Sequence, residues 1–139
     1  MPTVHYDVYL TFYGFDDNDD GEGHYGTSVI AYPHLHKVAT EDRGTYYQPS
    51  TCAAEKGFLK PGTKIYVPRL MKYYIMEDGC VECSQDWSSH KKRIDLFIQG
   101  TGPKLIDREN ELTLDSLEIV VFDPPPHLPV STKPLGPSS

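Results

Sequence analysis

Short runs of β-forming residues, each bounded by proline, glycine or acidic residues, recur along the chain. The clearest run, residues 4–13, alternates polar and apolar side chains in the way of a strand with one buried face. Further strands are predicted at residues 28–32, 64–67, 72–77, 94–98 and 117–122. Six short strands in about 120 residues, with no internal repeat and no convincing helical period, favour a small, mostly antiparallel barrel.

Between these strands the sequence predicts turns, loops and only short helices. One helical turn is expected over residues 51–56 and a short helix over residues 107–116. Residues 14–27 and 78–92 are rich in acidic and other polar side chains and are expected to be loops. The predicted fold class is therefore all-β, a six-stranded barrel with short helical turns.

Proline is concentrated at the C-terminal end of the chain. Six of the 16 residues from Pro124 onward are proline, and most of the others are small or polar. Such a composition is typical of a tail or linker rather than of a packed core. We therefore expect one barrel domain over residues 1–123 and a proline-rich, disordered tail or linker over residues 124–139.

The charge and the apolar pattern exclude two classes of partner. The formal net charge is −7, and the longest basic run, Lys91-Lys92-Arg93, is too short to follow a phosphate backbone. No nucleic-acid partner is therefore expected. No segment approaches the roughly 18 apolar residues that a membrane span requires. No membrane span is therefore expected.

The three cysteines, Cys52, Cys80 and Cys83, leave at least one thiol outside any internal disulfide. The C-x-x-C spacing of Cys80 and Cys83 suits a structural disulfide, half a zinc site or a redox pair. Zinc would need a second pair of ligands, for which His90 is the nearest candidate. A redox pair should lie at the N-terminus of a helix, whereas a loop is expected at Cys80 and Cys83. A structural disulfide between two of the three is favoured if the protein is extracellular.

Residues Asp16, Asn18 and Asp20, followed by Gly21, form the pattern D-x-N-x-D-G. This is the first half of an EF-hand-type calcium loop, in which oxygens at alternate positions converge on a hard cation. Thr27 stands where the loop needs its bidentate acid, and no flanking helices are predicted. A solvated acidic loop is the favoured interpretation, and no cofactor is expected.

Asp95 lies within the apolar strand predicted at 94–98. Alternation places its side chain on the face opposite Ile94 and Leu96. Two interpretations remain open: an outward aspartate with a lysine partner, or a carboxylate on a groove whose raised pKa suits a general acid. Glu77 and Asp78 end the preceding strand and point to opposite faces, so at most one of them can face Asp95.

Three segments together resemble the three-aspartate domain of lytic transglycosylases and cell-wall resuscitation proteins. Residues 59–68 are similar to its "P-x-GT-x-V-x-I-P" strand, residues 74–79 to its strand ending "EDTGG", and residues 92–97 to "G-N-RID-x-F". Residues 44–54 resemble the segment before the "GT" strand in barwin, expansin and family 45 endoglucanase relatives. The resemblance, which is good over residues 57–98, implies a double-psi β-barrel.

The resemblance also implies candidate site residues. Asp95 matches the catalytic acid of the lytic transglycosylases and family 45 endoglucanases, and Asp78 matches the aspartate of "EDTGG". The second endoglucanase aspartate, which is the base, falls near the end of the first strand, where Asp16 or Asp17 is the candidate. The chain departs from the pattern at "TGG", which is replaced by Gly79-Cys80-Val81.

Three classes of function follow. The first is cleavage of a polysaccharide or peptidoglycan-like glycan, by a hydrolytic or lytic transglycosylase-like route, with Asp95 protonating the glycosidic oxygen. The alternative is a non-catalytic, expansin-like or barwin-like module that binds carbohydrate or cell wall. In both, Tyr13, Tyr74 and Trp87 are candidates for stacking on sugar rings. A third class, a metal-dependent or redox protein, would use Cys80, Cys83, His90 and the acidic residues.

The N-terminal residues lack the basic region and apolar core of a signal peptide. Two interpretations remain open: a cytoplasmic protein, or an extracellular one whose signal peptide has been removed. The resemblance to secreted barrel proteins makes the extracellular location the expectation. The protein is expected to act as a monomer.

Overall fold

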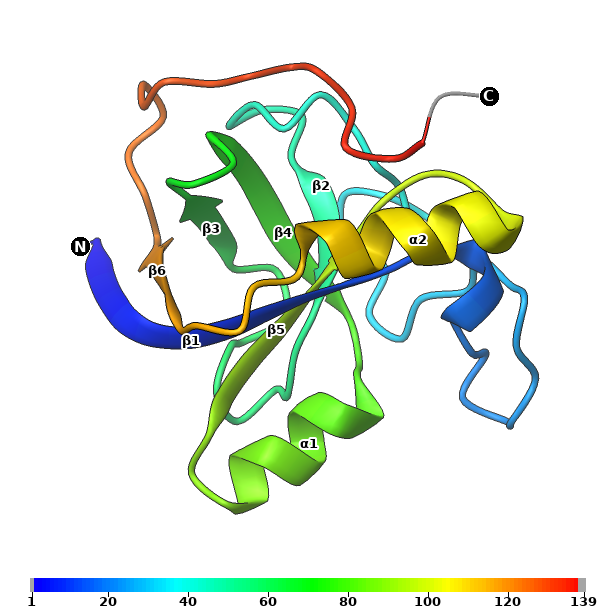
Figure 1. Ribbon diagram of the computed structural model, residues 1–139. Coiled ribbons are helices and arrows are strands. Elements are labelled where there is room, and N and C mark those ends of the chain that lie inside the picture. The colour runs from blue at the N-terminus through cyan, green and yellow to red at the C-terminus, as the bar shows by residue number, and fades with distance from the viewer. Residues whose placement is uncertain (1, 138–139) are drawn as a thin grey trace.

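The computed structural model describes residues 2–137, and within them six strands close into a barrel (Figure 1). The strands are β1 (Thr3–Tyr13), β2 (Ser50–Ala53), β3 (Lys64–Val67), β4 (Lys72–Asp78), β5 (Lys92–Phe97) and β6 (Glu118–Phe122). They follow one another around the barrel in the order β1-β5-β2-β4-β3-β6. The predicted six-stranded, all-β barrel is therefore confirmed.

The strand pairs are mostly antiparallel. β1 pairs with β5 and β2 with β4 in parallel, whereas the other neighbours around the barrel are antiparallel. Parallel neighbours need crossover connections rather than tight turns, so segments distant in the sequence lie side by side. This arrangement is compatible with the double-psi barrel that the resemblance implies.

The barrel interior is filled by apolar side chains from all the strands. Leu10 of β1, Met76 of β4, and Ile94 and Leu96 of β5 belong to one core cluster and are fully buried. The alternation along β5 then directs Asp95 away from this core, as the sequence predicted. The register places Asp95 opposite Thr11 of β1 on one side and opposite Ala53 of β2 on the other.

Two expectations for short segments are wrong. Residues 51–56 form no helical turn; most of β2 lies there, and all four of its residues are buried between β4 and β5. Residues 28–32 form no strand. Their backbone amides are satisfied elsewhere: the Ala31 amide donates to the Asp78 carboxylate and the Tyr32 amide to the Glu77 carbonyl. In both segments tertiary contacts outweigh local propensity.

The helical elements are η1 (Phe15–Asp17), α1 (Val81–Ser88) and α2 (Gly102–Leu112). α1 occupies part of the segment expected to be a loop, so that expectation is wrong. The Cys80 sulfur starts this helix by accepting the Cys83 amide at 3.1 Å. α2 begins five residues earlier than the helix predicted at 107–116, because a proline occupies its first turn.

Residues 124–137 run across the barrel rather than away from it (Figure 1). The Tyr73 hydroxyl donates to the Pro125 carbonyl. The Lys72 ammonium donates to the Ser131 and Lys133 carbonyls at 2.7 and 2.6 Å. Leu135 packs against the core cluster. This part of the expected disordered tail is therefore docked, because its carbonyls accept side-chain donors from the barrel.

Among the described residues, no helix combines the length and the apolar character that crossing a membrane would require.

Candidate functional site

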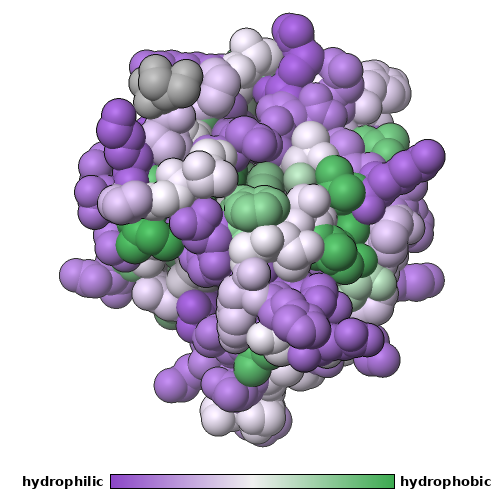
Figure 2. Space-filling model, turned by 90° about the vertical axis from the view of Figure 1, so that its right-hand side faces the viewer, coloured by the Kyte–Doolittle hydropathy of each residue, from purple (hydrophilic) through white to green (hydrophobic). Residues whose placement is uncertain are grey.

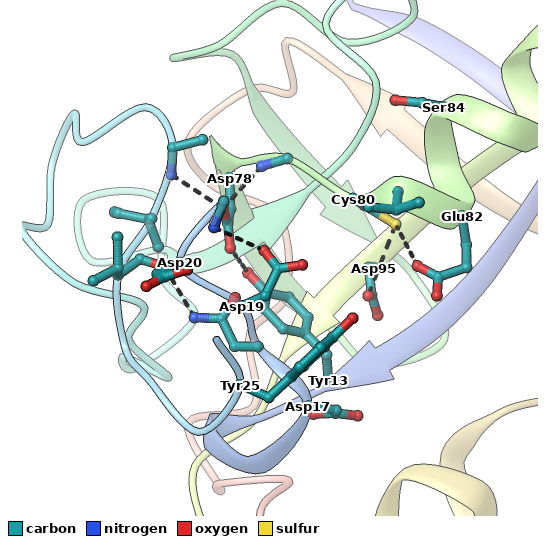
Figure 3. Close-up of a pocket in the computed structure, with 17 residues that line it drawn as sticks. Tyr13, Asp17, Asp19, Asp20, Tyr25, Asp78, Cys80, Glu82, Ser84 and Asp95 are labelled. Atoms are coloured by element: carbon teal, nitrogen blue, oxygen red, sulfur yellow. Dashed lines mark hydrogen bonds between the residues drawn. The ribbon is translucent and has the colours of Figure 1, made fainter. Parts of the chain in front are cut away.

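A groove of about 570 Å³ opens between the acidic loop, the end of β4 and the start of α1 (Figure 3). Among the described residues that line it, no lysine or arginine occurs. Its acidic lining residues are Asp17, Asp19, Asp20, Asp78, Glu82 and Asp95. The face of the molecule on the side of the acidic loop and α2 is mostly hydrophilic, with apolar side chains scattered over it (Figure 2).

Asp95 lies at the floor of this groove. The Thr11 hydroxyl donates to its Oδ1 atom at 3.1 Å. Burial raises the pKa of Asp95 to about 8, although the Thr11 hydrogen bond and the Arg93 charge oppose this shift. The carboxyl group therefore carries its proton at neutral pH, with Oδ1 accepting from Thr11 and Oδ2 left to hold the proton.

Asp78 also lines the groove, but its oxygens are occupied. Tyr13 donates its hydroxyl to Oδ2 at 2.9 Å, and the amides of Ala31 and Gly79 donate to Oδ1 at 3.1 and 2.9 Å. Burial raises the pKa of Asp78 to about 6, and these hydrogen bonds limit the rise. Asp78 is therefore well placed to hold the wall of the groove in position.

The two candidates for the base, Asp16 and Asp17, lie just after β1 and have different positions in the structure. Asp17 lines the groove, and its Oδ1 accepts the Gly14 amide at 2.7 Å. Asp16 instead accepts the Gly102 amide at 2.8 Å, at the start of α2. Asp17 is therefore the residue of this pair that lies with Asp95, whereas Asp16 holds α2 against the loop.

Glu109 of α2 joins these acids and was missed by the sequence analysis. It is buried, and its Oε2 atom has no hydrogen-bond partner among the described residues. Burial and the neighbouring Asp17 carboxylate raise the pKa of Glu109 to about 9. Leu105, Glu109 and Leu112 share the buried face of α2. Their spacing is helical, but it becomes visible only once the helix is begun at residue 102.

The aromatic residues are distributed differently from the expectation. Tyr13 lines the groove, but its ring is buried and its hydroxyl is engaged by Asp78. Tyr74 is 1% exposed in the barrel core, and Trp87 stacks on Phe58 outside the groove lining. Neither is placed to contact a ligand in the groove. Tyr25, which lines it and is 67% exposed, is the aromatic side chain available there.

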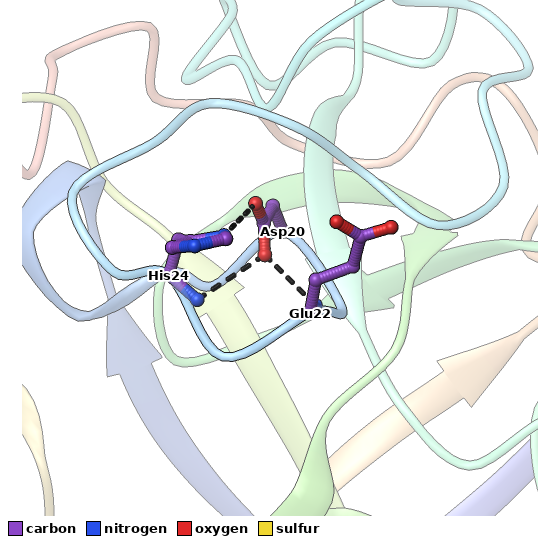
Figure 4. A group of neighbouring side chains, drawn as sticks. All are labelled: Asp20, Glu22 and His24. Carbon is purple, nitrogen blue, oxygen red and sulfur yellow. Dashed lines mark hydrogen bonds and ion pairs between the residues drawn. The ribbon is translucent and has the colours of Figure 1, made fainter.

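The residues of the calcium half-motif do not converge. Asn18 is buried and donates its amide to the Thr27 and Val29 carbonyls at 2.8 and 2.9 Å. Asp16 points to α2, and Asp20 points to His24 at 2.8 Å. Ligand-type atoms of Asp20, Glu22 and His24 do gather within 4.8 Å of one another (Figure 4). These side chains are largely exposed on the loop, where acidic groups gather with or without an ion.

Cys80 and Cys83 form a disulfide, and Cys52 is buried outside it. Burial and nearby carboxylates, that of Glu77 foremost, raise the pKa of the Cys52 thiol well above its usual range. The Cys80 sulfur lines the groove, 4.0 Å from Asp95 Oδ2 and 3.9 Å from Glu82 Oε2 (Figure 3). A disulfide and a protonated carboxyl group thus share one wall of the groove.

Glu77 is a further buried carboxylate and lies on the other side of β4. It accepts the Leu35 and His36 amides at 2.7 Å each, and the Thr51 hydroxyl at 2.8 Å. His36 lies 2.8 Å from Glu77 and 3.0 Å from Asp42. Burial lowers the pKa of His36, but the hydrogen bonds to these two carboxylates raise it above its usual value. This network attaches the segment before β2 to the barrel.

Fold and groove together define a closed β-barrel domain with an acidic groove that holds a protonated carboxyl group and a disulfide. A family model described as the DDB_G0273701 N-terminal domain matches residues 5–138, and the chain belongs to this family. The match continues through the docked segment after Pro124.

The chain is 41% identical over 118 residues, 81% of its length, to uncharacterized protein DDB_G0273701/DDB_G0273221 of Dictyostelium discoideum. It spans about half, 48%, of that relative's length. No solved structure matches the chain.

Proposed function

We propose that this domain cleaves glycosidic bonds in an extracellular polysaccharide, with Asp95 as the general acid. The supporting observation is the state of Asp95 itself: a groove-lining carboxyl group whose pKa of about 8 keeps it protonated at neutral pH. Protonation of the leaving oxygen is the step that a glycosidase requires of its acid. The resemblance of residues 57–98 to the three-aspartate domain points to the same residue.

Asp17 is the candidate for the second carboxylate. It lines the same groove from η1, an element separate from β5, whereas Asp78 has both oxygens engaged by donors. In an inverting reaction Asp17 would activate a water molecule, which requires a carboxyl separation of roughly 6.5–9.5 Å. In a lytic route Asp95 would act alone as acid and then as base.

The groove also limits the kind of glycan. Because its ionisable lining is acidic, an anionic polymer would be repelled, and a neutral or amino-sugar polysaccharide is the favoured substrate class. Carboxylates can accept hydrogen bonds from sugar hydroxyls, and the exposed ring of Tyr25 can stack on a sugar. The disulfide suits the oxidising extracellular location.

The test is release of soluble fragments and new reducing ends from neutral β-glucans, chitosan and peptidoglycan, followed by mass spectrometry. Asp95→Asn should lower the rate by about 100-fold or more, because the general acid is lost. Asp115→Asn, an exposed acid outside the groove, is the matched control and should leave the rate unchanged. Full activity of Asp95→Asn, or binding without fragment release from every polysaccharide, would contradict the proposal.

A further inference from the structure

We propose that the Cys80–Cys83 disulfide is a redox-active pair that accepts two electrons from the paired thiols of a cationic peptide. This activity is separate from glycan cleavage: its reacting atoms are the two sulfurs of the groove, and it shares only the proton donor Asp95 with the proposed cleavage. The placement of the two sulfurs, the groove beside them and the charge of its walls each contribute to the inference.

The first observation is the position of the pair at the start of a helix. Cys80 is the N-cap of α1, an eight-residue helix, and its sulfur accepts the Cys83 amide at 3.1 Å. Backbone amides and the positive end of a helix stabilise a thiolate, and the C-x-x-C motif places the first sulfur among them. The sequence predicted a loop after Cys80, and this argued against a redox pair. The structure has a helix there instead, so that objection no longer holds.

The second observation is the unequal exposure of the two sulfurs. Cys80 is partly exposed and lines the groove, whereas Cys83 is 1% exposed and its sulfur lies 3.9 Å from the Ala53 carbonyl. An incoming thiolate in the groove can therefore reach Cys80 and not Cys83. Attack at Cys80 makes Cys83 the leaving group. Thiol–disulfide exchange requires one sulfur that is attacked and one that leaves, and the structure assigns these roles to Cys80 and Cys83.

The third observation is a proton donor beside the reacting sulfur. Asp95 Oδ2 lies 4.0 Å from Cys80 Sγ (Figure 3), and burial leaves its carboxyl group protonated at neutral pH. Held neutral, Asp95 adds no negative charge next to a thiolate on Cys80. The other ionisable groups that act on Asp95 or are acted on by it are Arg93 on β5, Asp17 on η1, Glu82 on α1, Glu109 on α2, Tyr13 on β1 and Cys52 on β2.

The exchange proceeds in two balanced steps. A substrate thiolate attacks Cys80 Sγ, the Cys80–Cys83 bond breaks, and Cys83 leaves with the electron pair and takes a proton from solvent. The second substrate thiolate then attacks the substrate sulfur of the mixed disulfide, and Cys80 leaves with its electron pair and takes the Asp95 proton. Solvent then returns a proton to Asp95. The substrate dithiol has lost two electrons and two protons, and the protein has gained two electrons and two protons as the Cys80 and Cys83 thiols.

The charge of the groove specifies the partner. Six acidic side chains line it, and no lysine or arginine does among the described lining residues. A cationic peptide would therefore be drawn to Cys80, and an anionic one repelled. The class of substrate is a peptide dithiol flanked by lysine or arginine.

The experiment uses the oxidised, unaltered chain and two synthetic peptides that contain the same cysteine pair, one flanked by lysines and one by glutamates. Peptide disulfide is measured by mass spectrometry. Exchange with the folded protein is stopped by acid, and the protein thiols are then alkylated in denaturant and mapped to individual cysteines. We expect one peptide disulfide for each protein disulfide reduced, and a rate at least about tenfold higher for the lysine peptide. A disulfide that is reduced only after unfolding, or equal rates for the two peptides, would overturn the proposal.

Single-cysteine variants test the division of roles. Cys83→Ser should trap a mixed disulfide with the oxidised lysine peptide through Cys80, and Cys80→Ser should do so at least about tenfold more slowly, because Cys83 is buried. Equal trapping would contradict the assignment. If either variant fails to fold, the mapping of alkylated cysteines in the unaltered chain decides which sulfur carries the peptide.

A pH profile tests the role of Asp95. Below about pH 8 the native protein should exchange faster than Asp95→Asn. Above it the native rate should fall to that of Asp95→Asn or below, because the proton is then lost and the carboxylate is negatively charged. Parallel profiles would remove Asp95 from the step. Exchange is measured without glycan, and glycan cleavage with the protein kept oxidised, so each activity can fail without the other.

Discussion

Thr11 and Asp95 face each other across the parallel pair of β1 and β5, and the Thr11 hydroxyl donates a 3.1 Å hydrogen bond to Asp95 Oδ1. This hydrogen bond stabilises the ionised carboxylate, while burial favours the protonated form more strongly. The protonation state of Asp95 is thus set by a balance: burial favours the protonated form, and the Thr11 hydroxyl and the Arg93 charge favour the ionised form.

Replacing Thr11 by valine removes that hydroxyl with little change of shape. The pKa of Asp95 should then rise above about 8, because the interaction that lowers it is lost. Carboxyl-carbon NMR titration measures the change directly. Thr3→Val, at the exposed start of β1, is the control. A lowered or unchanged pKa in Thr11→Val would show that the hydroxyl does not act on Asp95.

Asp95 should make the free energy of unfolding fall as the pH rises. Its pKa of about 8 in the folded state lies above the ordinary value of 3.8, so the folded chain binds more protons than the unfolded chain between these values. This contribution to stability is complete below about pH 4, falls progressively as the pH rises from about 4 to about 8, and is absent above about pH 8.

Asp95→Asn removes this dependence. It should gain stability relative to the native chain by at least about 1 kcal/mol between about pH 5 and pH 9, after allowance for screening by solvent. Urea denaturation at several pH values measures it. A difference between the two chains that stays constant with pH would contradict the raised pKa.

Glu109 is buried, and its Oε2 atom has no hydrogen-bond partner in the part of the chain that the structure describes, which is a destabilising arrangement. Glu109→Leu should raise the free energy of unfolding by about 1–2 kcal/mol, because an unsatisfied polar group is replaced by an apolar one. Thermal and urea unfolding provide the measurement. The exposed acid Glu111, replaced by leucine, serves as the comparison on the same helix. Destabilisation by Glu109→Leu alone would mean that Glu109 has a partner in solution.

Glu77, in contrast to Glu109, is expected to stabilise the folded chain. Its carboxylate accepts hydrogen bonds from the Leu35 and His36 amides and from the Thr51 hydroxyl. Glu77→Ala should lower the free energy of unfolding by about 3 kcal/mol or more, because several buried donors lose their acceptor. Glu111→Ala should change it by less than about 0.5 kcal/mol. Similar values for both variants would show that the network is not needed for stability.

Truncation after Asp123 removes the segment that docks on the barrel. The hydroxyls of Tyr66 and Tyr73 and the Lys72 ammonium would lose their carbonyl acceptors, and the contact of Leu135 with the core would be lost. We expect the free energy of unfolding to fall by roughly 2 kcal/mol or more. An unchanged unfolding midpoint would mean that this segment behaves as the detached tail that its composition suggests.

The strands that the sequence predicted well are those in which the pattern is local. Alternation over residues 4–13 and 94–98, and the run of β-forming residues at 72–77, are visible in the chain alone, so each of these strands and the outward direction of Asp95 follow from the sequence. The acidic character of the loop and the possibility of a disulfide at Cys80 and Cys83 are likewise local properties.

Only the tertiary structure decided which of these residues meet. β2 is a strand because β4 and β5 bury it, and α1 begins where the Cys80 sulfur caps it. Segments far apart in the sequence meet at Asp95: Thr11 lies 84 positions away. The pKa of Asp95 follows from this burial, because the cost of desolvating a carboxylate depends on everything packed around it, and no single segment of sequence contains that information.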